Sequence, residues 1–378
     1  MSTRKPAPAK AVPQRRRPPS RRAGGASKLP SIDLALQGGG SHGAFTWGVL
    51  DALLEDGRLR IDGVCGTSAG ALNAGILAVG YARGGADAAR EALRSFWMDI
   101  ASSGACFGGA QAQAAWGMPA DLNRFNMDSN PFFQIGMGWL KALGPYQFNP
   151  LGLDPLRTVL ARHLDEAALR EGPLEIFIAA TDVQTGQPEI FSGRRLGIDA
   201  LLASACLPQL FQAVIIDGRP YWDGGYSGNP ALWPLIYQTD ASDLLLVKIN
   251  PLVRPGVPDR PDEIADRVNE ITFNAGLVAE MRAIHFVQRL LAEHRLESGR
   301  YKDLRLHMVA DETSLGELRP SSKMNTDRDF LLTLHDLGRV AAQRWLAAHA
   351  ADVGQRSSVD IEAAFLAPRQ GRGAGEAA

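Results

Sequence analysis

Two glycine-bearing stretches near the start of the chain most constrain what this sequence can fold into. The first covers residues 38–43 (GGGSHG) and the second covers residues 66–70 (GTSAG). Each lies between an apolar, strand-like run and a helix-like run. Strand, turn and helix repeated in this way are typical of an α/β fold, with a mainly parallel central sheet covered by helices on both faces. We therefore predict a three-layer α/β/α architecture.

The stretch at 66–70 predicts a serine held in a sharp turn. Ser68 follows a short apolar strand expected at 61–65 and precedes a buried helix expected at 71–79. Gly66, Ala69 and Gly70 have little or no side chain, as a tight strand-to-helix turn requires. Ser68 would then lie at a helix N-terminus, where the helix dipole favours developing negative charge. Taken alone, the pattern GxSxG is equally compatible with an ordinary tight turn.

The stretch at 38–43 predicts an anion-binding loop, because glycines at a helix start leave backbone N–H groups uncovered. Such a loop can hold an oxyanion or a phosphate. Gly38, Gly40 and Gly43 also fit the dinucleotide pattern GxGxxG, and Asp62 lies at about the 20-residue spacing of a ribose ligand. Asp62, however, falls at the start of the second strand, whereas a ribose ligand lies at the C-terminal end. The nucleotide interpretation is therefore the less favoured one.

A third candidate is the aspartate of Asp223-Gly224-Gly225. It follows an apolar stretch at 213–216, and two glycines after an aspartate suit a strand end that turns sharply and presents its carboxylate at the sheet rim. A plain Asp-Gly turn explains the same residues. Asp182 is a second aspartate at an expected strand end, but the hairpin-like turn that follows it favours a capping role.

In this order the motifs resemble those of the patatin-like phospholipases. Residues 38–43 are similar to the oxyanion loop of that family, residues 66–70 to its nucleophile elbow and residues 223–225 to the segment of its catalytic aspartate. Residues 203–208 (ASACLP) are similar to the Ala-Ser-x-Ala-x-Pro segment that commonly precedes the aspartate, with Cys206 in place of the usual alanine. His42 stands where the family more often has arginine or lysine. The resemblance covers roughly residues 32–230.

The resemblance implies a serine acyl hydrolase that cleaves lipid acyl esters, of the phospholipase A or lipid acyl hydrolase type. Ser68 would attack the ester carbonyl and Asp223 would accept its proton, as a Ser-Asp dyad. The backbone N–H groups of Gly38, Gly39 and Gly40 would hold the oxyanion. No cofactor and no metal is implied. A non-catalytic lipid- or nucleotide-binding protein that keeps the glycine loops is the alternative.

The histidines leave a Ser-His-Asp triad formally open, because His294, His307 and His335 follow Asp223 in the chain order of α/β hydrolases. Two of them lie in helix-like stretches and His307 lies in a strand-like one. None has the loop setting of a catalytic base, so we expect structural roles for all three. His42 would either fill the glycine loop or contact a lipid headgroup.

The remaining sequence suggests one main domain with flanking segments. We expect a disordered basic, Pro-rich tail at 1–30, the hydrolase domain at 31–350 and a partly disordered C-terminal extension at 351–378. A Gly- and aromatic-rich insertion at 101–150 is too irregular to predict a helix or strand. It would contribute to the core or form a lid or acyl-chain pocket over Ser68. A long helix expected at 259–296 would most simply pack on the sheet.

The tail is strongly basic. Nine of the 40 Lys and Arg residues lie within 1–28, which leaves 31 against 41 acidic residues elsewhere, a net charge of about −10. Such a tail could hold the protein near anionic lipid, at about 1 kcal/mol per basic residue at the surface. Solvation alone is an equal alternative, and nucleic-acid contact is a less favoured one.

The sequence has no apolar stretch of the kind expected in a signal peptide or a membrane span. Its three cysteines have no zinc-like spacing. We therefore expect a cytoplasmic protein, with peripheral membrane association through the tail as an open possibility.

Overall fold

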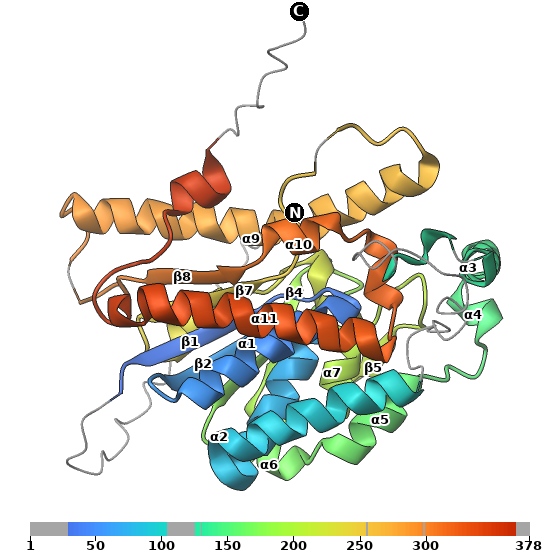
Figure 1. Ribbon diagram of the computed structural model, residues 1–378, viewed down its shortest axis with the longest axis horizontal. Coiled ribbons are helices and arrows are strands. Elements are labelled where there is room, and N and C mark those ends of the chain that lie inside the picture. Colours follow the sequence, from blue (N-terminus) through green and yellow to red (C-terminus); the bar gives the residue numbers. More distant parts are fainter. Residues whose placement is uncertain (1–28, 104–124, 130, 255, 298, 368–378) are drawn as a thin grey trace, which may run out of the picture.

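The fold is built around one central sheet with helices on both faces (Figure 1). The computed structural model describes residues 29–103, 125–129, 131–254, 256–297 and 299–367. The basic tail at 1–28 and part of the insertion, at 104–124, lie outside the described residues, as does the end of the chain from 368.

Five neighbouring strands of the sheet are parallel. In sheet order they are β3 (Glu175–Asp182), β2 (Arg60–Thr67), β1 (Ser31–Leu36), β7 (Asp243–Lys248) and β8 (Arg305–Ala310). The sheet also has an antiparallel part around β3. There β4 (Pro188–Ser192) and β6 (Arg219–Asp223) both pair with β3, and β5 (Val214–Ile216) pairs with β6. The predicted mainly parallel sheet is confirmed.

The helices form the two outer layers. They are α1 (Gly43–Asp56), α2 (Ala69–Ser103), α3 (Pro131–Leu143), α4 (Pro145–Phe148), α5 (Pro155–His163), α6 (Glu166–Glu171), α7 (Ile198–Ser204), α8 (Trp233–Gln238), α9 (Pro261–Ala292), α10 (Glu312–Glu317) and α11 (Arg328–His349). Successive side chains of a strand point to opposite faces. Leu34 and Leu36 of β1 therefore pack with α1, α2 and α11, whereas Ala35 packs on the side of α8 and α9.

Helix α11 lies directly against α1. A side chain on Gly48 would overlap the His335 carbonyl group, and one on Gly338 would overlap the Phe45 carbonyl group. The two helix backbones therefore touch at this crossing. Since α1 begins immediately after the glycine loop at 38–42, α11 helps to fix the position of that loop.

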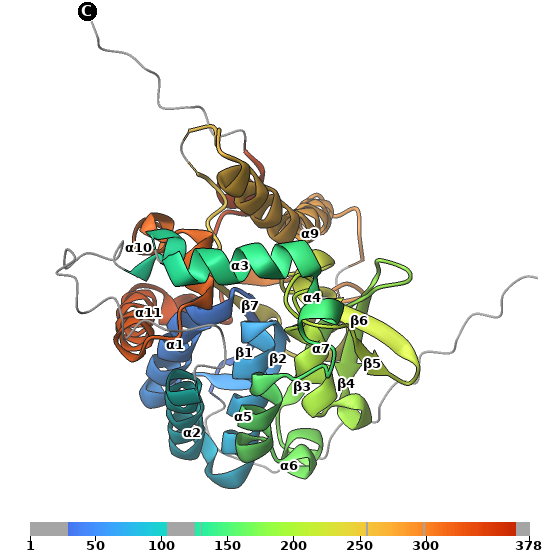
Figure 2. The same ribbon diagram turned by 90° about the vertical axis from the view of Figure 1, so that its right-hand side faces the viewer.

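The insertion forms a helix that the sequence did not predict. Gly136 and Gly138 weaken the helical pattern of α3, because glycine is a poor helix former. Figure 2 shows α3 crossing the end of the sheet at which β1 and β2 lead into the glycine loop and Ser68. Its Leu140 is buried, whereas Ile135 and Trp139 are exposed. A role as a lid stays a prediction.

The long helix predicted at 259–296 corresponds to α9, and only its second half packs fully on the sheet. Leu277 and Met281 are buried there, whereas Ile264, Val268 and Ile271 in the first half are exposed. Within the described residues, no helix combines the length and the apolar character needed to cross a bilayer.

Candidate active site

Ser68 occupies the sharp turn between β2 and α2, as the sequence predicted. Its backbone has a φ of 53°, a conformation that residues other than glycine rarely adopt and that is common at functional sites. The turn is closely packed, because a side chain on Gly70 would overlap the Leu36 carbonyl group. Only 8% of the Ser68 surface is exposed. The serine is thus held in a strained position at the carboxyl end of a central strand.

Ser204, the last residue of α7, fixes the backbone of this turn. The Ser68 N–H group donates to Ser204 Oγ at 2.8 Å, and the Ser204 hydroxyl donates to the Ala179 carbonyl oxygen at 2.6 Å. Both groups are buried. The Ala-Ser-x-Ala-x-Pro resemblance included Ser204 but assigned it no role. Its hydroxyl links the turn to β3.

Asp223 lies beside Ser68, on the same edge of β3. Thr67, which precedes the serine, pairs with Ala179, and Asp223 pairs with the adjacent Ala180. The aspartate ends β6 and caps the short helical turn at Gly224–Tyr226, where its Oδ1 accepts the Gly225 N–H group at 2.7 Å. A Cβ atom on Gly224 would lie 3.0 Å from Cγ2 of Thr67, so the ends of β2 and β6 meet along one edge of β3 and bring the two candidate groups together.

The Asp223 carboxyl group is completely buried, and none of the described residues forms a hydrogen bond to its Oδ2 atom within ordinary geometry. Burial raises the pKa of Asp223 from 3.8 to about 7. The Gly225 N–H group, the Ser68 hydroxyl group and the Lys323 ammonium group each act in the opposite direction. A carboxyl group with a pKa near neutrality is a far stronger base than an exposed one.

The glycine loop packs directly on the serine. A Cβ atom on Gly38 would lie 2.6 Å from the Cβ of Ser68. The Gly38 N–H group donates to Asn229 Oδ1 at 2.6 Å. Among the described residues, the N–H groups of Gly39 and Gly40 have no acceptor, and Gly40 has a left-handed backbone with a φ of 57°. Two backbone donors are therefore unused beside Ser68, while that of Gly38 is engaged.

His42 ties the loop to the C-terminal part of the chain. Its Nε2 atom lies 2.8 Å from Ser322 Oγ, and the Ser322 hydroxyl donates to the Arg319 carbonyl oxygen. Nε2 must therefore carry the proton and donate. Burial holds the pKa of His42 well below its usual value, so the ring is neutral. With 1% of its surface exposed, His42 is not open to a lipid headgroup.

The other candidate residues have structural partners. Asp182 Oδ1 accepts the N–H groups of Gln184 and Thr185, which confirms the predicted capping role. Asp62, which the nucleotide interpretation would need as a ribose ligand, accepts two backbone N–H groups at 240–241 from the start of β2.

The three later histidines lie apart from Ser68. His307 forms hydrogen bonds with Asp243 and Ser358 near the starts of β7 and β8, whereas Ser68 lies at the carboxyl end of the parallel strands. His335 stacks on Trp47 of α1. His294 follows the end of α9. Among the described residues, no histidine forms a hydrogen bond with Ser68, and no group of three His, Cys, Asp or Glu side chains is arranged as metal ligands would be.

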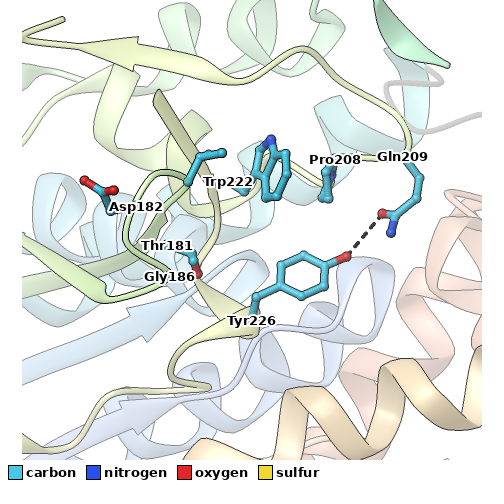
Figure 3. A pocket seen from close by; sticks show the side chains of 8 residues that line it. Thr181, Asp182, Gly186, Pro208, Gln209, Trp222 and Tyr226 are labelled. Carbon is cyan, nitrogen blue, oxygen red and sulfur yellow. Dashed lines mark hydrogen bonds between the residues drawn. The ribbon is translucent and has the colours of Figure 1, made fainter. Parts of the chain in front are cut away.

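A surface pocket of about 530 Å³ adjoins the strand that carries Asp223 (Figure 3). Trp222 and Tyr226, which precede and follow Asp223 in the sequence, both line it. The Tyr226 hydroxyl donates to Gln209 Oε1 at 3.1 Å. Asp182 also lines this pocket, while Ser68 does not. The pocket is thus a neighbour of the candidate site and is separate from the serine.

An α/β fold with a strained serine at a strand-to-helix turn, a glycine loop and a buried carboxyl group has the components of a serine hydrolase. A family model described as patatin-like phospholipase matches residues 34–236, more than half of the 378 residues. The chain therefore belongs to the patatin-like phospholipase family, a family of lipid acyl hydrolases. The resemblance seen in the motifs is confirmed.

Several solved structures are similar in fold. VipD from Legionella pneumophila shares 15% identity with a TM-score of 0.40, over 90% of this chain and 73% of VipD. The type III effector ExoU shares 16% with a TM-score of 0.31, over 85% of this chain and 54% of ExoU. Human GIVD cytosolic phospholipase A2 shares 11% with a TM-score of 0.35, over 87% of this chain and 60% of that one. At these values we take nothing about activity from them. No curated protein matches the sequence.

Proposed function

We propose that this protein is a serine acyl hydrolase that cleaves lipid acyl esters by a Ser-Asp dyad, as a phospholipase A or a broader lipid acyl hydrolase. Family membership supports the lipid ester as substrate. The observation that carries the dyad is the buried Asp223 carboxyl group, whose pKa the Ser68 hydroxyl group lowers and which has one oxygen unbonded among the described residues.

In the acylation step, the Ser68 Oγ atom forms a bond to the ester carbonyl carbon while its proton passes to Asp223. The carbonyl oxygen becomes an oxyanion. We assign its stabilisation to the unused N–H groups of Gly39 and Gly40, with Gly38 supporting the loop through Asn229. The carbon–oxygen bond of the leaving alcohol then breaks, and Asp223 returns the proton to that oxygen. An acyl ester of Ser68 remains.

In the deacylation step, water gives a proton to Asp223 and attacks the acyl carbonyl carbon. The second oxyanion collapses, the bond to Ser68 Oγ breaks, and the serine recovers its proton. The fatty acid leaves. With a pKa of about 7, Asp223 is partly ionised at neutral pH and can act as base and then as acid in both steps.

Active-site labelling tests this proposal. We expect a fluorophosphonate to label wild-type protein on Ser68, as mapped by peptide mass, and to leave Ser68→Ala unlabelled. Asp223→Asn should label much more slowly. Asp182→Asn is the matched control, because Asp182 also ends a neighbouring strand but serves a turn; its labelling rate should stay near that of wild type.

Wild-type protein that stays unlabelled, even with anionic vesicles, would contradict the proposal. It would favour the non-catalytic alternative. A nucleotide-binding protein should then gain thermal stability with a nucleotide, whereas a lipid-binding one should bind vesicles without turnover.

A further inference from the structure

Lys323 lies beside the glycine loop, although it is far from that loop in the sequence. It belongs to a short helical turn at Pro320–Met324, beyond the residues matched by the family model. Its carbonyl oxygen occupies the space that a side chain on Gly40 would need. The backbone of this turn is therefore in contact with the loop at Gly40, one of the two residues whose N–H group is unused.

The ammonium group of Lys323 is tied to the same loop. Lys323 Nζ donates to Asn250 Oδ1 at 2.8 Å, and Asn250 Nδ2 donates to the Gly38 carbonyl oxygen at 2.7 Å. An ammonium group has three donors. Within the part of the chain that the structure describes, Asn250 accepts the single hydrogen bond that Nζ makes. Two donors of Nζ therefore have no protein acceptor there.

The nearby acidic group is already occupied. Glu270 exerts the strongest attraction on Lys323, but its carboxylate is bound by Arg254 and Arg267. Arg254 also donates to the carbonyl oxygens of Gly316 and Leu318, so its guanidinium group is engaged. No described carboxylate forms an ion pair with Lys323. Lys323 as a whole is half-buried, and burial of its ammonium group lowers the pKa of Lys323.

The charge of Lys323 acts on the proposed reaction centre, since it lowers the pKa of both Asp223 and His42. His42 itself is neutral and buried. The positive charge at this loop therefore comes from position 323 and not from position 42. A cation with unused donors, tied to the glycine loop that packs on Ser68, matches the phosphate of a phospholipid, which lies a few bonds from its acyl esters.

We propose that Lys323 Nζ binds the phosphate of a phospholipid whose acyl ester lies at Ser68, and so makes the site selective for phosphate-bearing lipids over neutral acyl esters. The proposal rests on the proposed function for the ester chemistry. The cation itself is independent of that chemistry, so the two can be tested apart.

The first test compares two substrates with the same acyl chain, lysophosphatidylcholine and monoacylglycerol, in the same neutral detergent. We expect Lys323→Met to lower kcat/KM about 10- to 100-fold for the phospholipid and less than about threefold for the neutral ester. Lys323→Arg should keep most of the preference. Lys323→Gln, which can still donate to Asn250, should lose it as the methionine variant does. Taking the ratio of the two substrates removes any shared effect on Asp223.

Arg295→Met is the matched control, because it removes one exposed charge beyond the far end of α9. It should leave kcat/KM unchanged for both substrates. An equal loss on both substrates in Lys323→Met would overturn the proposal and assign Lys323 to loop structure or to catalysis in general.

The second test does not need turnover. Monomeric dihexanoylphosphatidylcholine is titrated into Ser68→Ala and into Ser68→Ala combined with Lys323→Met. We expect the same 10- to 100-fold weakening, and unchanged affinity would overturn the proposal. Inorganic phosphate should bind far more weakly than the lipid; binding of equal strength would assign the cation to free phosphate instead. If wild type is neither labelled nor active while this titration succeeds, the proposed function fails and the phosphate site stands.

Discussion

Replacing Asp223 with asparagine should abolish most activity and, at the same time, stabilise the folded protein at high pH. The carboxyl group is fully buried, and its pKa is raised from 3.8 to about 7, mainly by the loss of hydration. A raised pKa means that folding disfavours the ionised form. Asparagine keeps an oxygen that can accept the Gly225 N–H group, and it carries no charge to bury.

The sign follows from proton linkage. Below pH 3.8 the carboxyl group is protonated in both the folded and the unfolded state, so its ionisation has no effect on stability. Between pH 3.8 and about 7 the unfolded chain releases the proton while the folded protein retains it, and stability falls as pH rises. Above about pH 7 both states are ionised and the loss is complete. Asparagine has no such loss at any pH.

A pKa change from 3.8 to about 7 corresponds to about 4 kcal/mol of unfolding free energy. The difference in unfolding free energy between Asp223→Asn and wild type should therefore grow, in favour of the variant, by about 2–3 kcal/mol between pH 5 and pH 8. Asp33 and Glu280 are buried carboxyl groups with raised pKa values of about 7, but they are present in both proteins and cancel in the difference.

The assay is denaturant unfolding of both proteins at pH 5 and pH 8, with fluorophosphonate labelling of Ser68 on the same samples. We expect a variant that is more stable at pH 8 and nearly inert. A free-energy difference between the two proteins that is equal at both pH values would refute the reasoning. It would mean that Asp223 ionises in the folded protein at its ordinary pKa, with no cost of burial.

Three further substitutions probe how the site is held. Gly38→Ala should abolish labelling of Ser68 and cost about 1–3 kcal/mol of stability, measured by denaturant unfolding, because the new methyl group would lie 2.6 Å from the Cβ of the serine. Ser204→Ala should cost about 1–3 kcal/mol and slow acylation in stopped-flow labelling, since it leaves the buried Ser68 N–H group without its acceptor; normal rates would show that the serine turn holds itself. Gly338→Ala should cost about 3 kcal/mol and reduce activity, because it separates α11 from α1 at Phe45, and an unchanged melting temperature would contradict that contact.

The sequence was sufficient wherever a feature is encoded by adjacent residues. The strand before Ser68, the turn and the helix after it occupy one continuous stretch, and β2 and α2 occur there. The same holds for the glycine loop and for the strand end at Asp223. The role of Asp182 could be distinguished from that of Asp223 because a turn follows Asp182, and a turn is also encoded by adjacent residues.

The sequence was not sufficient where distant segments meet. Asn229, Asn250 and Lys323 all act on the glycine loop, yet each lies about 190 residues or more from it. A lysine in a polar segment looks like a surface residue, and nothing in its neighbours indicates an unpaired charge in a site. Helix α3 was missed for a different reason, because Gly136 and Gly138 obscure its pattern.

The glycine loop is held from two sides, and this arrangement brings the residues at positions 42 and 323 close enough to influence each other electrostatically. On one side Asn229 binds Gly38 from within the family-matched residues; on the other, Ser322 and Lys323 come from beyond them. An arginine at position 42 would bring a second positive charge into the buried space already influenced by Lys323, at an electrostatic cost that a neutral ring avoids. A neutral side chain at position 42 therefore avoids electrostatic repulsion with the charged Lys323. In this chain the positive charge that acts on His42 and Asp223 is that of Lys323, which comes from another segment.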